Sequence, residues 1–324
     1  MRRTLIVKRF KRFKRFKRFG RLANRSAEAP ATERSLISPL EWKQRDVQVI
    51  HWTIFALLTL LTVTTLGPLL WMFSGALKSS VEIFRTPPVL WPAAPEWSNF
   101  ARAWTELNSL LYLVNTAILA FGAVVLQFVV SATAAYALSK LRPIFSNALL
   151  FFFLSTLMVP ALAYLIPQYL TVVHLSIFGV SLINSWWAVW LPEAANAFNI
   201  IVLKSFFDTI PNELCDAARI DGASALQVFL YIIVPLSRPA LAVVAMFTIF
   251  ATWKDFLWPL LVLVDTSKQP ISVALYQLGI AASNGVPQNV LLAGFIFAML
   301  PPVILFLIFQ RQIIRGVNTT GLKG

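Results

Sequence analysis

The chain has 324 residues, of which 58% are hydrophobic and 13% charged, and its 28 Lys and Arg outnumber its 14 Asp and Glu. A mean hydropathy of +0.70 excludes an ordinary soluble domain, in which about a quarter of the residues are charged. The lone cysteine, Cys215, excludes an intrachain disulfide and a CxxC metal site. Because the sequence contains no GxxxxGK[ST] phosphate loop, we expect no ATPase activity of this chain itself. No catalytic constellation is visible either, so we expect no catalytic residues and no metal or cofactor held by this chain.

The N-terminal segment 1–49 is a basic tail in which Lys-Arg-Phe is repeated four times over Lys8–Phe19. Three interpretations stay open: attraction to anionic lipid headgroups, worth roughly 1 kcal/mol per basic residue near the surface, binding of nucleic acid, and a disordered repeat without a role. A period of three argues against an amphipathic helix, because the Phe positions drift by about 60° per repeat. We predict a disordered cytoplasmic tail and no nucleic-acid partner.

Residues 50–324 are predicted to form an all-α polytopic membrane domain. A bilayer core about 30 Å thick needs roughly 20 apolar residues per helix. Six stretches meet this length: 51–74, 111–137, 145–169, 180–203, 239–264 and 289–310. Prolines 160 and 167 in the third stretch, and Pro301-Pro302 in the sixth, predict kinks that neighbouring helices must cover. The first stretch starts too far from Met1 for a cleaved signal peptide and is predicted to be an uncleaved anchor.

The distribution of Lys and Arg predicts that both termini are cytoplasmic. With the N-terminal tail left out, 8 basic residues fall in the predicted inner segments 138–144, 204–238 and 311–324. The predicted outer segments 75–110 and 265–288 hold 4. Positively charged residues stay preferentially on the cytoplasmic side. We therefore expect a multi-pass protein of the bacterial plasma (inner) membrane.

A polar stretch between the fourth and fifth predicted spans, 212–239, is expected to fold into two short helices joined at Asp221-Gly222. Asp208 or Thr209 is predicted to cap the first helix, and Pro211 suits its first turn. Gly222 can take the left-handed conformation that ends a helix.

The second short helix of this stretch is predicted to begin at a capping box formed by Ser224 and Gln227. Its apolar face continues to Pro235, which is expected to stop it. From there the chain is expected to run straight into the fifth span at Pro239. A rigid two-helix module between membrane spans is suited to being gripped by a cytoplasmic partner.

The same stretch resembles the EAA loop of ABC-importer permeases, whose pattern is Glu-Ala-Ala, three residues, Gly, nine residues, and Ile-x-Leu-Pro. The spacing is kept, with Asp in place of the Glu and Val in place of the Leu. PNELCDAARIDGAS (211–224) and the ending RGVNTTGLKG (315–324) are similar to the carbohydrate-uptake branch, in particular to its maltose-permease-like second subunit. The resemblance covers about 50–324. It implies a coupling loop at 204–238 whose ATPase-coupling residues are Asp216, Ala217, Ala218, Asp221, Gly222, Ile232 and Pro235.

This resemblance also implies the type I ABC-importer permease fold with six transmembrane helices. It implies that the chain forms half of the pathway for a sugar or a related hydroxyl-rich solute, such as a polyol or a glycosylated osmolyte. The partners implied are a second permease subunit, two ATP-binding-cassette ATPase subunits that hold ATP and Mg²⁺, and an extracytoplasmic solute-binding protein.

Polar and aromatic residues within the predicted spans are candidates for the translocation path, because buried ionisable groups are costly in a membrane. These candidates are Tyr164, Gln168, Glu193, Asn196 and Trp253. Glu193 could instead pair with a neighbouring helix. A cluster of tryptophans at 186, 187 and 190 is expected to form an interfacial belt at the outer end of the fourth span.

Two other classes of function remain open on the residues alone. An ion-coupled secondary transporter could use Glu193 and Asp255 as coupling carboxylates, and a membrane scaffold could recruit proteins through the coupling loop and the basic tail. A secondary transporter does not need the two-helix loop, and a scaffold does not need kinked spans. The sequence therefore favours the ATP-driven permease.

Overall fold

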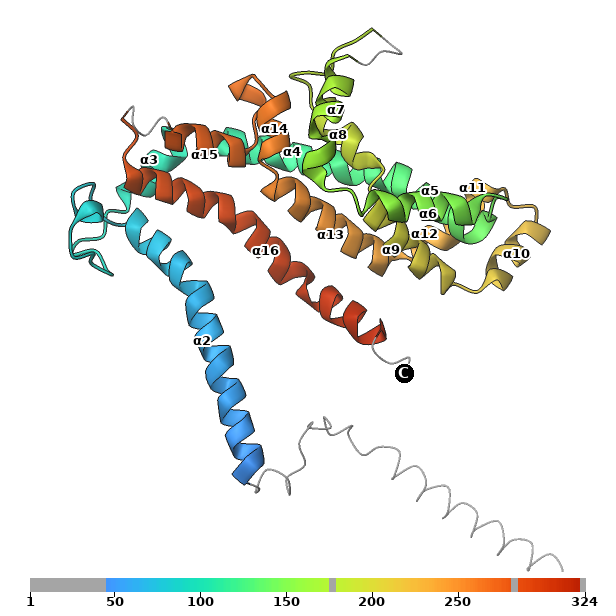
Figure 1. The fold of residues 1–324 in the computed structure, drawn as a ribbon, viewed down its shortest axis with the longest axis horizontal. Coiled ribbons are helices and arrows are strands. Elements are labelled where there is room, and N and C mark those ends of the chain that lie inside the picture. Colours follow the sequence, from blue (N-terminus) through green and yellow to red (C-terminus); the bar gives the residue numbers. More distant parts are fainter. Residues whose placement is uncertain (1–44, 175–178, 281–284, 321–324) are drawn as a thin grey trace, which may run out of the picture. The chain divides into compact units, whose positions relative to one another are not determined.

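The computed structural model describes residues 45–174, 179–280 and 285–320, and of 311–320 only the helical backbone (Figure 1). The predicted tail lies outside these residues apart from its last five, which begin the first helix. The chain divides into two compact units at Gly67/Pro68, and each unit is described by itself.

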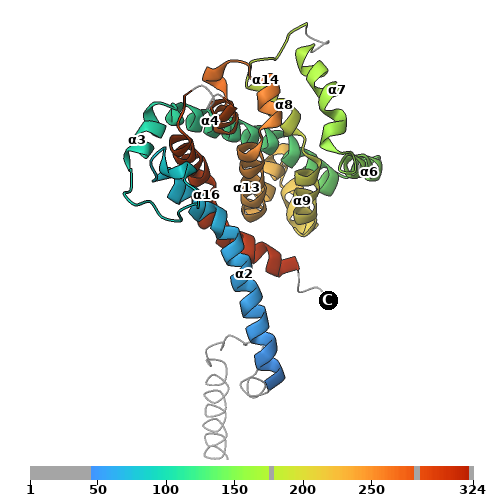
Figure 2. The ribbon, with the colours of Figure 1, turned by 60° about the vertical axis from the view of Figure 1, so that its left-hand side comes forward.

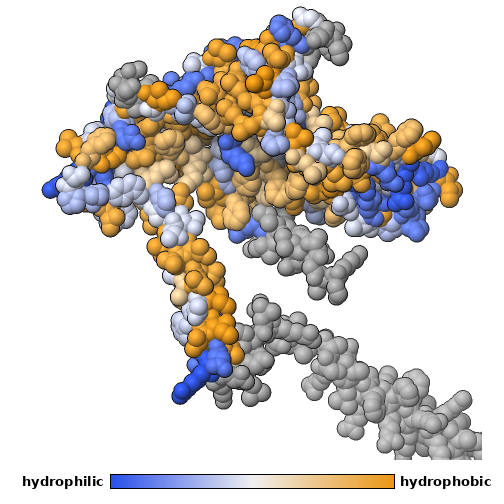
Figure 3. All heavy atoms as spheres, viewed as in Figure 1, coloured by the Kyte–Doolittle hydropathy of each residue, from blue (hydrophilic) through white to orange (hydrophobic). Residues whose placement is uncertain are grey.

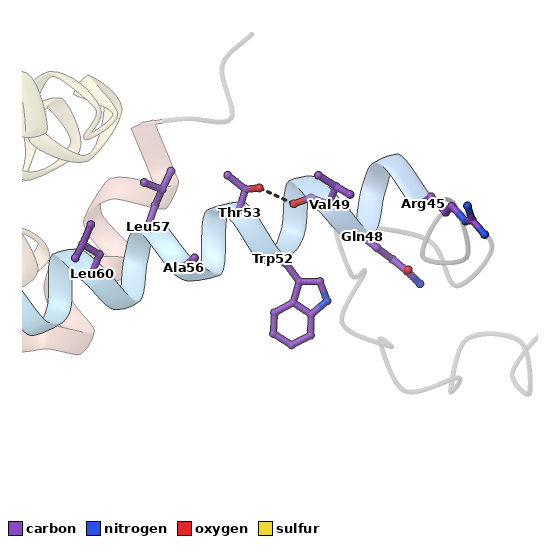
Figure 4. Close-up of a pocket in the computed structure, with 8 residues that line it drawn as sticks. All are labelled: Arg45, Gln48, Val49, Trp52, Thr53, Ala56, Leu57 and Leu60. Carbon is purple, nitrogen blue, oxygen red and sulfur yellow. Dashed lines mark hydrogen bonds between the residues drawn. The ribbon is translucent and has the colours of Figure 1, made fainter.

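Helix α2 (Arg45–Ala76) starts in the first unit and is apolar around its whole circumference. Thr53, Thr59 and Thr62 donate their hydroxyls to the carbonyls four residues earlier, which satisfies these polar groups within the helix. Figure 4 shows eight of its side chains between Arg45 and Leu60, and the large apolar ones among them are each more than half exposed. A helix of 32 residues with this surface is long enough to span a bilayer. The first predicted span is confirmed.

The second unit opens with η2 (Glu82–Phe84) and α3 (Ser98–Thr105). A continuous helical rod of 33 residues follows over Ser109–Leu141. It consists of α4 (Ser109–Gln127), the π-helical η3 (Phe128–Ala132), α5 (Thr133–Tyr136) and the π-helical η4 (Ala137–Leu141). This rod contains the predicted second span, and the left-handed residue Arg142 ends it.

The third predicted span, 145–169, is two helices rather than one. Helices α6 (Ser146–Thr156) and α7 (Ala161–Val173) meet at 104°. Pro160 stands directly before α7 and has an extended backbone, whereas Pro167 lies inside α7 without ending it. The predicted kink is therefore confirmed at Pro160, and the kink at Pro167 stays a prediction.

The prediction of one continuous span at 180–203 is also wrong, because α8 (Trp187–Ala194) and α9 (Ala197–Asp208) are separate helices. Pro192 inside α8 cannot donate to the carbonyl of Ala188, and the indole Nε1 of Trp258 donates to that carbonyl at 3.0 Å instead. Asn196 then starts α9, since its side chain accepts from the backbone N–H of Asn199 at 3.2 Å.

Helices α10 (Asn212–Ile220) and α11 (Ala225–Val228), the π-helical η5 (Phe229–Ile233) and α12 (Val234–Leu236) lie within the predicted coupling loop, 204–238, and that segment keeps this name below. The fifth predicted span, 239–264, is divided between α13 (Arg238–Lys254) and α14 (Leu257–Val262). Segments η6 (Thr266–Lys268) and α15 (Ile271–Ile280) lead to α16 (Gln288–Thr320), which contains the sixth predicted span and runs through Pro301-Pro302.

By length and composition, the described residues hold three helices that can cross a membrane, or up to five if each bent pair is one span. The other predicted spans are assembled from shorter helices. Figure 2 shows α13, α9 and α16 running beside one another below the rod that begins with α4.

Buried side chains of the second unit form three apolar clusters. One joins α3, α15 and α16, and another joins α4, α8 and α14. The third joins α5, α9, α10, η5 and α13, with Phe207, Phe229 and Ile233 at most 3% exposed. The third cluster lies directly under the coupling loop and positions the site described next.

Candidate functional site

The first helix of the coupling loop, α10, begins without a side-chain cap. Pro211 precedes it and makes no capping hydrogen bond. The predicted caps are occupied elsewhere, since Asp208 accepts from the Ser139 hydroxyl at 2.7 Å and the Thr209 hydroxyl donates to the carbonyl of Phe206 at 2.7 Å. The prediction that Asp208 or Thr209 caps α10 is therefore wrong, because tertiary and local bonds compete for both side chains.

The turn between the two short helices has the predicted geometry. Gly222 has φ +87°, in the left-handed region. Its N–H donates to the carbonyl of Arg219 at 3.0 Å, and the N–H of Ala223 donates to that of Ala218 at 2.9 Å. This pair of bonds is the Schellman motif that closes a helix C-terminus. The bend at Asp221-Gly222 is confirmed.

The second short helix begins at the predicted capping box. The N–H of Gln227 donates to the Ser224 hydroxyl at 3.4 Å, and the Gln227 side chain accepts from the N–H of Ser224 at 2.7 Å. Pro235, however, lies inside the helical segment that continues to Leu236. The wider π-helical turn of η5 alters the backbone bonding just before this proline, which has no N–H to contribute.

The connection to α13 also differs from the prediction. The segment Ala225–Leu236 meets α13 at 82°, and the bend lies at the buried Ser237. The N–H of this serine donates to the carbonyls of Ile233 and Val234. The second helix of the loop therefore lies nearly perpendicular to α13. The predicted straight continuation into the fifth span is wrong.

The predicted coupling residues divide into two groups by their surroundings. Ala218, Asp221, Gly222 and Ile232 line one surface groove of about 390 Å³, together with Ala223, Gln227, Val228 and Tyr231. Asp216, Ala217 and Pro235 are exposed and are not part of the groove lining. Figure 3 shows hydrophilic surface gathered at the end of the molecule that carries α10. The loop thus offers both a recess and a polar surface to a partner.

Three residues of the neighbouring rod hold the loop in place and were missed by the sequence reasoning. The Tyr136 hydroxyl donates to the carbonyl of Ala225 at 3.1 Å. The Lys140 ammonium donates to the carbonyl of Ile210 and to Asn212 Oδ1, the latter at 2.9 Å. Ser139 binds Asp208 as described above. The only sequence signal for this anchor is the polar pair Ser139-Lys140 at the end of the second predicted span.

Asp208 is the electrostatic centre of that anchor. Burial acts to raise the pKa of its carboxyl, but hydrogen bonds from Lys204 and Ser139 hold the pKa below its ordinary value. The ammonium of Lys204 lies 2.7 Å from the carboxylate. The carboxylate is therefore ionised at neutral pH and ties α9 to η4.

Of the predicted translocation-path residues, Glu193 and Asn196 flank the break between α8 and α9. A break within a membrane leaves backbone carbonyls that need donors. The amide of Gln127 donates to the carbonyl of Glu193 at 2.9 Å, and the Ser131 hydroxyl donates to that of Ala194 at 2.8 Å. The rod of the second span therefore satisfies the break.

Gln127 also connects the break to two further helices. Its Oε1 accepts from Asn199 of α9 at 2.6 Å and from the hydroxyl of Thr248 of α13. All three side chains of this buried polar network are at most 3% exposed. Glu193 is half-buried, and its carboxylate forms a hydrogen bond with the Asn196 side chain. The carboxylate of Asp255, also half-buried, is near enough to interact electrostatically with that of Glu193.

The remaining path candidates lie on other elements. Tyr164 and Gln168 project from α7, where the tyrosine is 46% exposed. Trp253 of α13 donates its indole N–H to the carbonyl of Ala298 in α16 at 3.0 Å, so it fastens two helices. The structure brings Glu193 and Asn196 together at one break, and the role of all five candidates in the translocation path remains a prediction.

The tryptophan cluster is not only an interfacial belt, because at least one of its rings packs between two helices. Trp190 donates its indole N–H to the carbonyl of Leu119 at 3.0 Å and its ring covers Gly122. Trp187 is the most exposed of the three, at 49%. At least Trp190 therefore joins α8 to α4, where only a glycine leaves room for the ring.

Among the residues that the structure describes, no three His, Cys, Asp or Glu side chains gather in a way that could hold a metal ion.

A family model described as "Binding-protein-dependent transport system inner membrane component" matches residues 127–319. "Probable ABC transporter permease protein YurM" of Bacillus subtilis (strain 168) is 32% identical over 276 residues, which cover 84% of this chain and 88% of that protein. "sn-glycerol-3-phosphate transport system permease protein UgpE" of Yersinia pestis bv. Antiqua (strain Antiqua) is 32% identical over 259 residues, covering 78% and 90%.

A solved structure has the same fold. It is titled "Crystal structure of a bacterial ABC transporter involved in the import of the acidic polysaccharide alginate", and one of its chains superposes with a TM-score of 0.72 at 24% identity. The match covers 83% of this chain and 98% of that one. This likeness shows that the two chains share a fold.

Proposed function

Because this chain belongs to the family of binding-protein-dependent transport system inner membrane components, we propose that its segment 204–238 receives a separate ATPase and passes the motion of that ATPase to the membrane helices. The chain is an ABC-importer permease subunit. One observation carries the proposal: a two-helix module closed by Gly222 and Ser224 is exposed to a partner on one side and hydrogen-bonded to the rod on the other.

The geometry supports force transmission through this module. Helix α9 enters the loop and α13 leaves it, so a push on α10 acts on two membrane helices at once. Tyr136 and Lys140 bind the module to the end of the rod. These bonds keep the module rigid, so that a force on α10 moves the membrane helices and does not only bend the loop. Two ATPase subunits holding ATP and Mg²⁺, and a second permease subunit beside this one, would complete the machine.

For the solute, we propose a sugar or another neutral, hydroxyl-rich compound such as a polyol or a glycosylated osmolyte, delivered by an extracytoplasmic binding protein. The names of the relatives above contain sn-glycerol-3-phosphate and the acidic polysaccharide alginate. Both compounds are rich in hydroxyls, which supports the hydroxyl-rich class, but both are anions, so the neutral charge proposed here rests on the residues of this chain alone. The half-buried carboxylates Glu193 and Asp255 beside the α8–α9 break favour a neutral solute over an anion.

The proposal is tested with the purified complex in lipid nanodiscs. ATP hydrolysis should rise when the loaded binding protein is added, and Ala217→Trp should abolish that rise by blocking the ATPase contact. Ala217 is exposed and faces away from the core, so the larger ring should not disturb the fold of this chain. Hydrolysis that does not respond to any loaded binding protein would contradict the delivery step.

Uptake in intact cells separates this function from ion-coupled transport. When the proton gradient is collapsed while ATP is maintained, uptake should continue. Loss of uptake under that condition, with Glu193→Gln having the same effect, would favour a secondary transporter that uses Glu193 and Asp255.

A further inference from the structure

The segment between α2 and α3 is not a long helix, yet it exposes several large apolar side chains. Four of them form what is here named the apolar crest: Val81, Phe84, Leu90 and Trp91, which are 84%, 74%, 76% and 62% exposed. In Figures 1 and 2 this segment lies beside α3. In water such a surface would be unfavourable, so the crest needs an apolar environment.

Hydrogen bonds fold the crest back onto the last turn of α2. The Ser74 hydroxyl donates to the carbonyl of Leu90, and the Lys78 ammonium donates to that of Val89. Farther along, the N–H of Glu96 donates to the carbonyl of Leu77 at 2.8 Å. Leu90 and Trp91 are therefore held at the level of residues 74–78 and do not project beyond the end of the helix.

Lys78 makes this fold-back firm. Its side chain is 2% exposed, and its ammonium lies 4.3 Å from the centre of the Trp71 ring. Its own carbonyl accepts from the amides of Asn99 at 3.0 Å and Asn289 at 2.9 Å. A buried cation that is bonded to a carbonyl and covered by an aromatic ring fixes the segment more tightly than an exposed loop would be.

The level of the crest relative to the membrane follows from α2. A helix of 32 residues is about 48 Å long at 1.5 Å per residue, whereas the hydrocarbon core is about 30 Å thick and the headgroup layers extend it to about 40–45 Å. The last turn of α2 therefore lies in or beside a headgroup layer. Tryptophan and other aromatic side chains are enriched at this depth.

We infer that the apolar crest inserts into the lipid leaflet at the C-terminal end of α2 and anchors that end of the helix at the membrane interface. The exposed Arg85, next to Phe84, is placed to meet lipid phosphates. Trp97 is 64% exposed but is not counted in the crest, because its ring centre lies 6.0 Å from that of Phe100 and it belongs to the packing of α3. The bound surface is a phospholipid interface and not a protein. The inference does not depend on the coupling loop or on the solute.

The test uses the full-length chain in its assembled complex, with Cys215→Ala and no reactive cysteine on the other subunits. A bimane label is attached at Trp91→Cys or, as a second position, at Phe84→Cys, and the complex is placed in nanodiscs. Phosphatidylcholine brominated near the top of its acyl chains should quench both labels. The matched control is Thr266→Cys in the exposed turn η6, which should respond to aqueous iodide and not to bromine.

Two results would overturn the inference. Quenching at 84 and 91 by iodide, without an effect of the brominated lipid, would show that the crest stands in water. Shielding from iodide that arises only when the loaded binding protein is added would show that the crest is a protein-docking surface. Lys78→Met should release the segment and move the label at 91 from lipid quenching toward iodide quenching.

Discussion

Gly222 shows how one residue can matter through its backbone alone. A Cβ built at this position would meet no atom within 4 Å, so space does not exclude a side chain. The positive φ does, because a left-handed conformation costs an L residue roughly 1–2 kcal/mol. The glycine therefore allows the backbone conformation that joins α10 to α11. It also lines the groove without contributing a side chain.

We expect Gly222→Val to leave the protein in the membrane while uptake and binding-protein-stimulated ATP hydrolysis fall sharply. Gly179 provides a matched control, since it also has a positive φ, +61°, and open space around it but lies outside the coupling loop. Gly179→Val should keep both activities. If both variants transported normally with the ATPase bound, the loop would not be the coupling element.

Gly122 is the opposite case, in which space decides. A Cβ there would overlap the indole ring of Trp190. We expect Gly122→Ala to lower the free energy of unfolding by about 1–3 kcal/mol, as overpacking does in a tight contact, because α4 and α8 must separate. Thermal unfolding of the purified complex measures the change. Gly67→Ala, at a glycine of α2 with no atom within 4 Å, should be close to neutral.

At the scale of elements, the coupling loop depends on the end of the rod as much as on its own caps. Asp208 contributes through its ionised form, whose pKa in the folded protein is depressed. Such a group stabilises fully above its unfolded pKa of about 3.9, and its contribution is lost as the pH falls through the lower folded pKa.

The stability advantage of the native complex over Asp208→Asn should therefore be largest near neutral pH and shrink as the pH falls below about 4. Thermal unfolding across pH 3–7 measures it. Asp216→Asn is the control, because Asp216 is an exposed partner of Arg219 at 3.0 Å and should change stability little at any pH. A constant difference for Asp208→Asn across this range would show that the carboxylate has no special role.

The break between α8 and α9 is stabilised by hydrogen bonds from the second span. Gln127→Leu would leave the Glu193 carbonyl without its donor and would remove the 2.6 Å acceptor of Asn199, which keeps only the 3.4 Å bond to Thr248. The Thr248 hydroxyl would keep the carbonyl of Val244 as its acceptor. Each unpaired buried group costs about 1–3 kcal/mol, so this variant should unfold at a markedly lower temperature. Leu126→Ile, at the neighbouring position on the rod, should not. Equal unfolding temperatures for Gln127→Leu and the native chain would mean that water or another side chain replaces the amide.

At the scale of the whole molecule, topology is the property most open to a direct test. With both termini inside, Ser80→Cys should react with an impermeant thiol reagent in intact cells, and Glu213→Cys should react only after the membrane is opened. Both are made in a Cys215→Ala background. Cys215 itself is 2% exposed and would stay unlabelled on either side of the membrane. Labelling of Glu213→Cys from outside would reverse the orientation.

Family membership and coupling geometry also constrain the assembly. The described residues of this chain have much apolar surface on α2 and around α6 and α7. In the proposed assembly, lipid and a second permease subunit cover this surface between them. Comparing the native mass of the detergent-purified complex with the masses of its subunits would count the permeases.

The amino-acid sequence by itself determined what short-range interactions control. Apolar run length located the first, second and sixth spans, and Ser224, Gln227 and Gly222 specified the capping box and the left-handed turn from within a few residues. These features need no distant partner, because each hydrogen bond closes inside one turn of the chain.

Only the tertiary structure decided the break between α8 and α9 and the anchoring of the coupling loop. Each depends on a partner far along the chain: Gln127 reaches Glu193 across 66 residues, and Tyr136 reaches Ala225 across 89. A helix interrupted in a membrane is stable only if another helix supplies the missing donors. Local pattern can mark the proline or asparagine at such a place, but the donor that makes the interruption stable comes from a contact that only the folded chain creates.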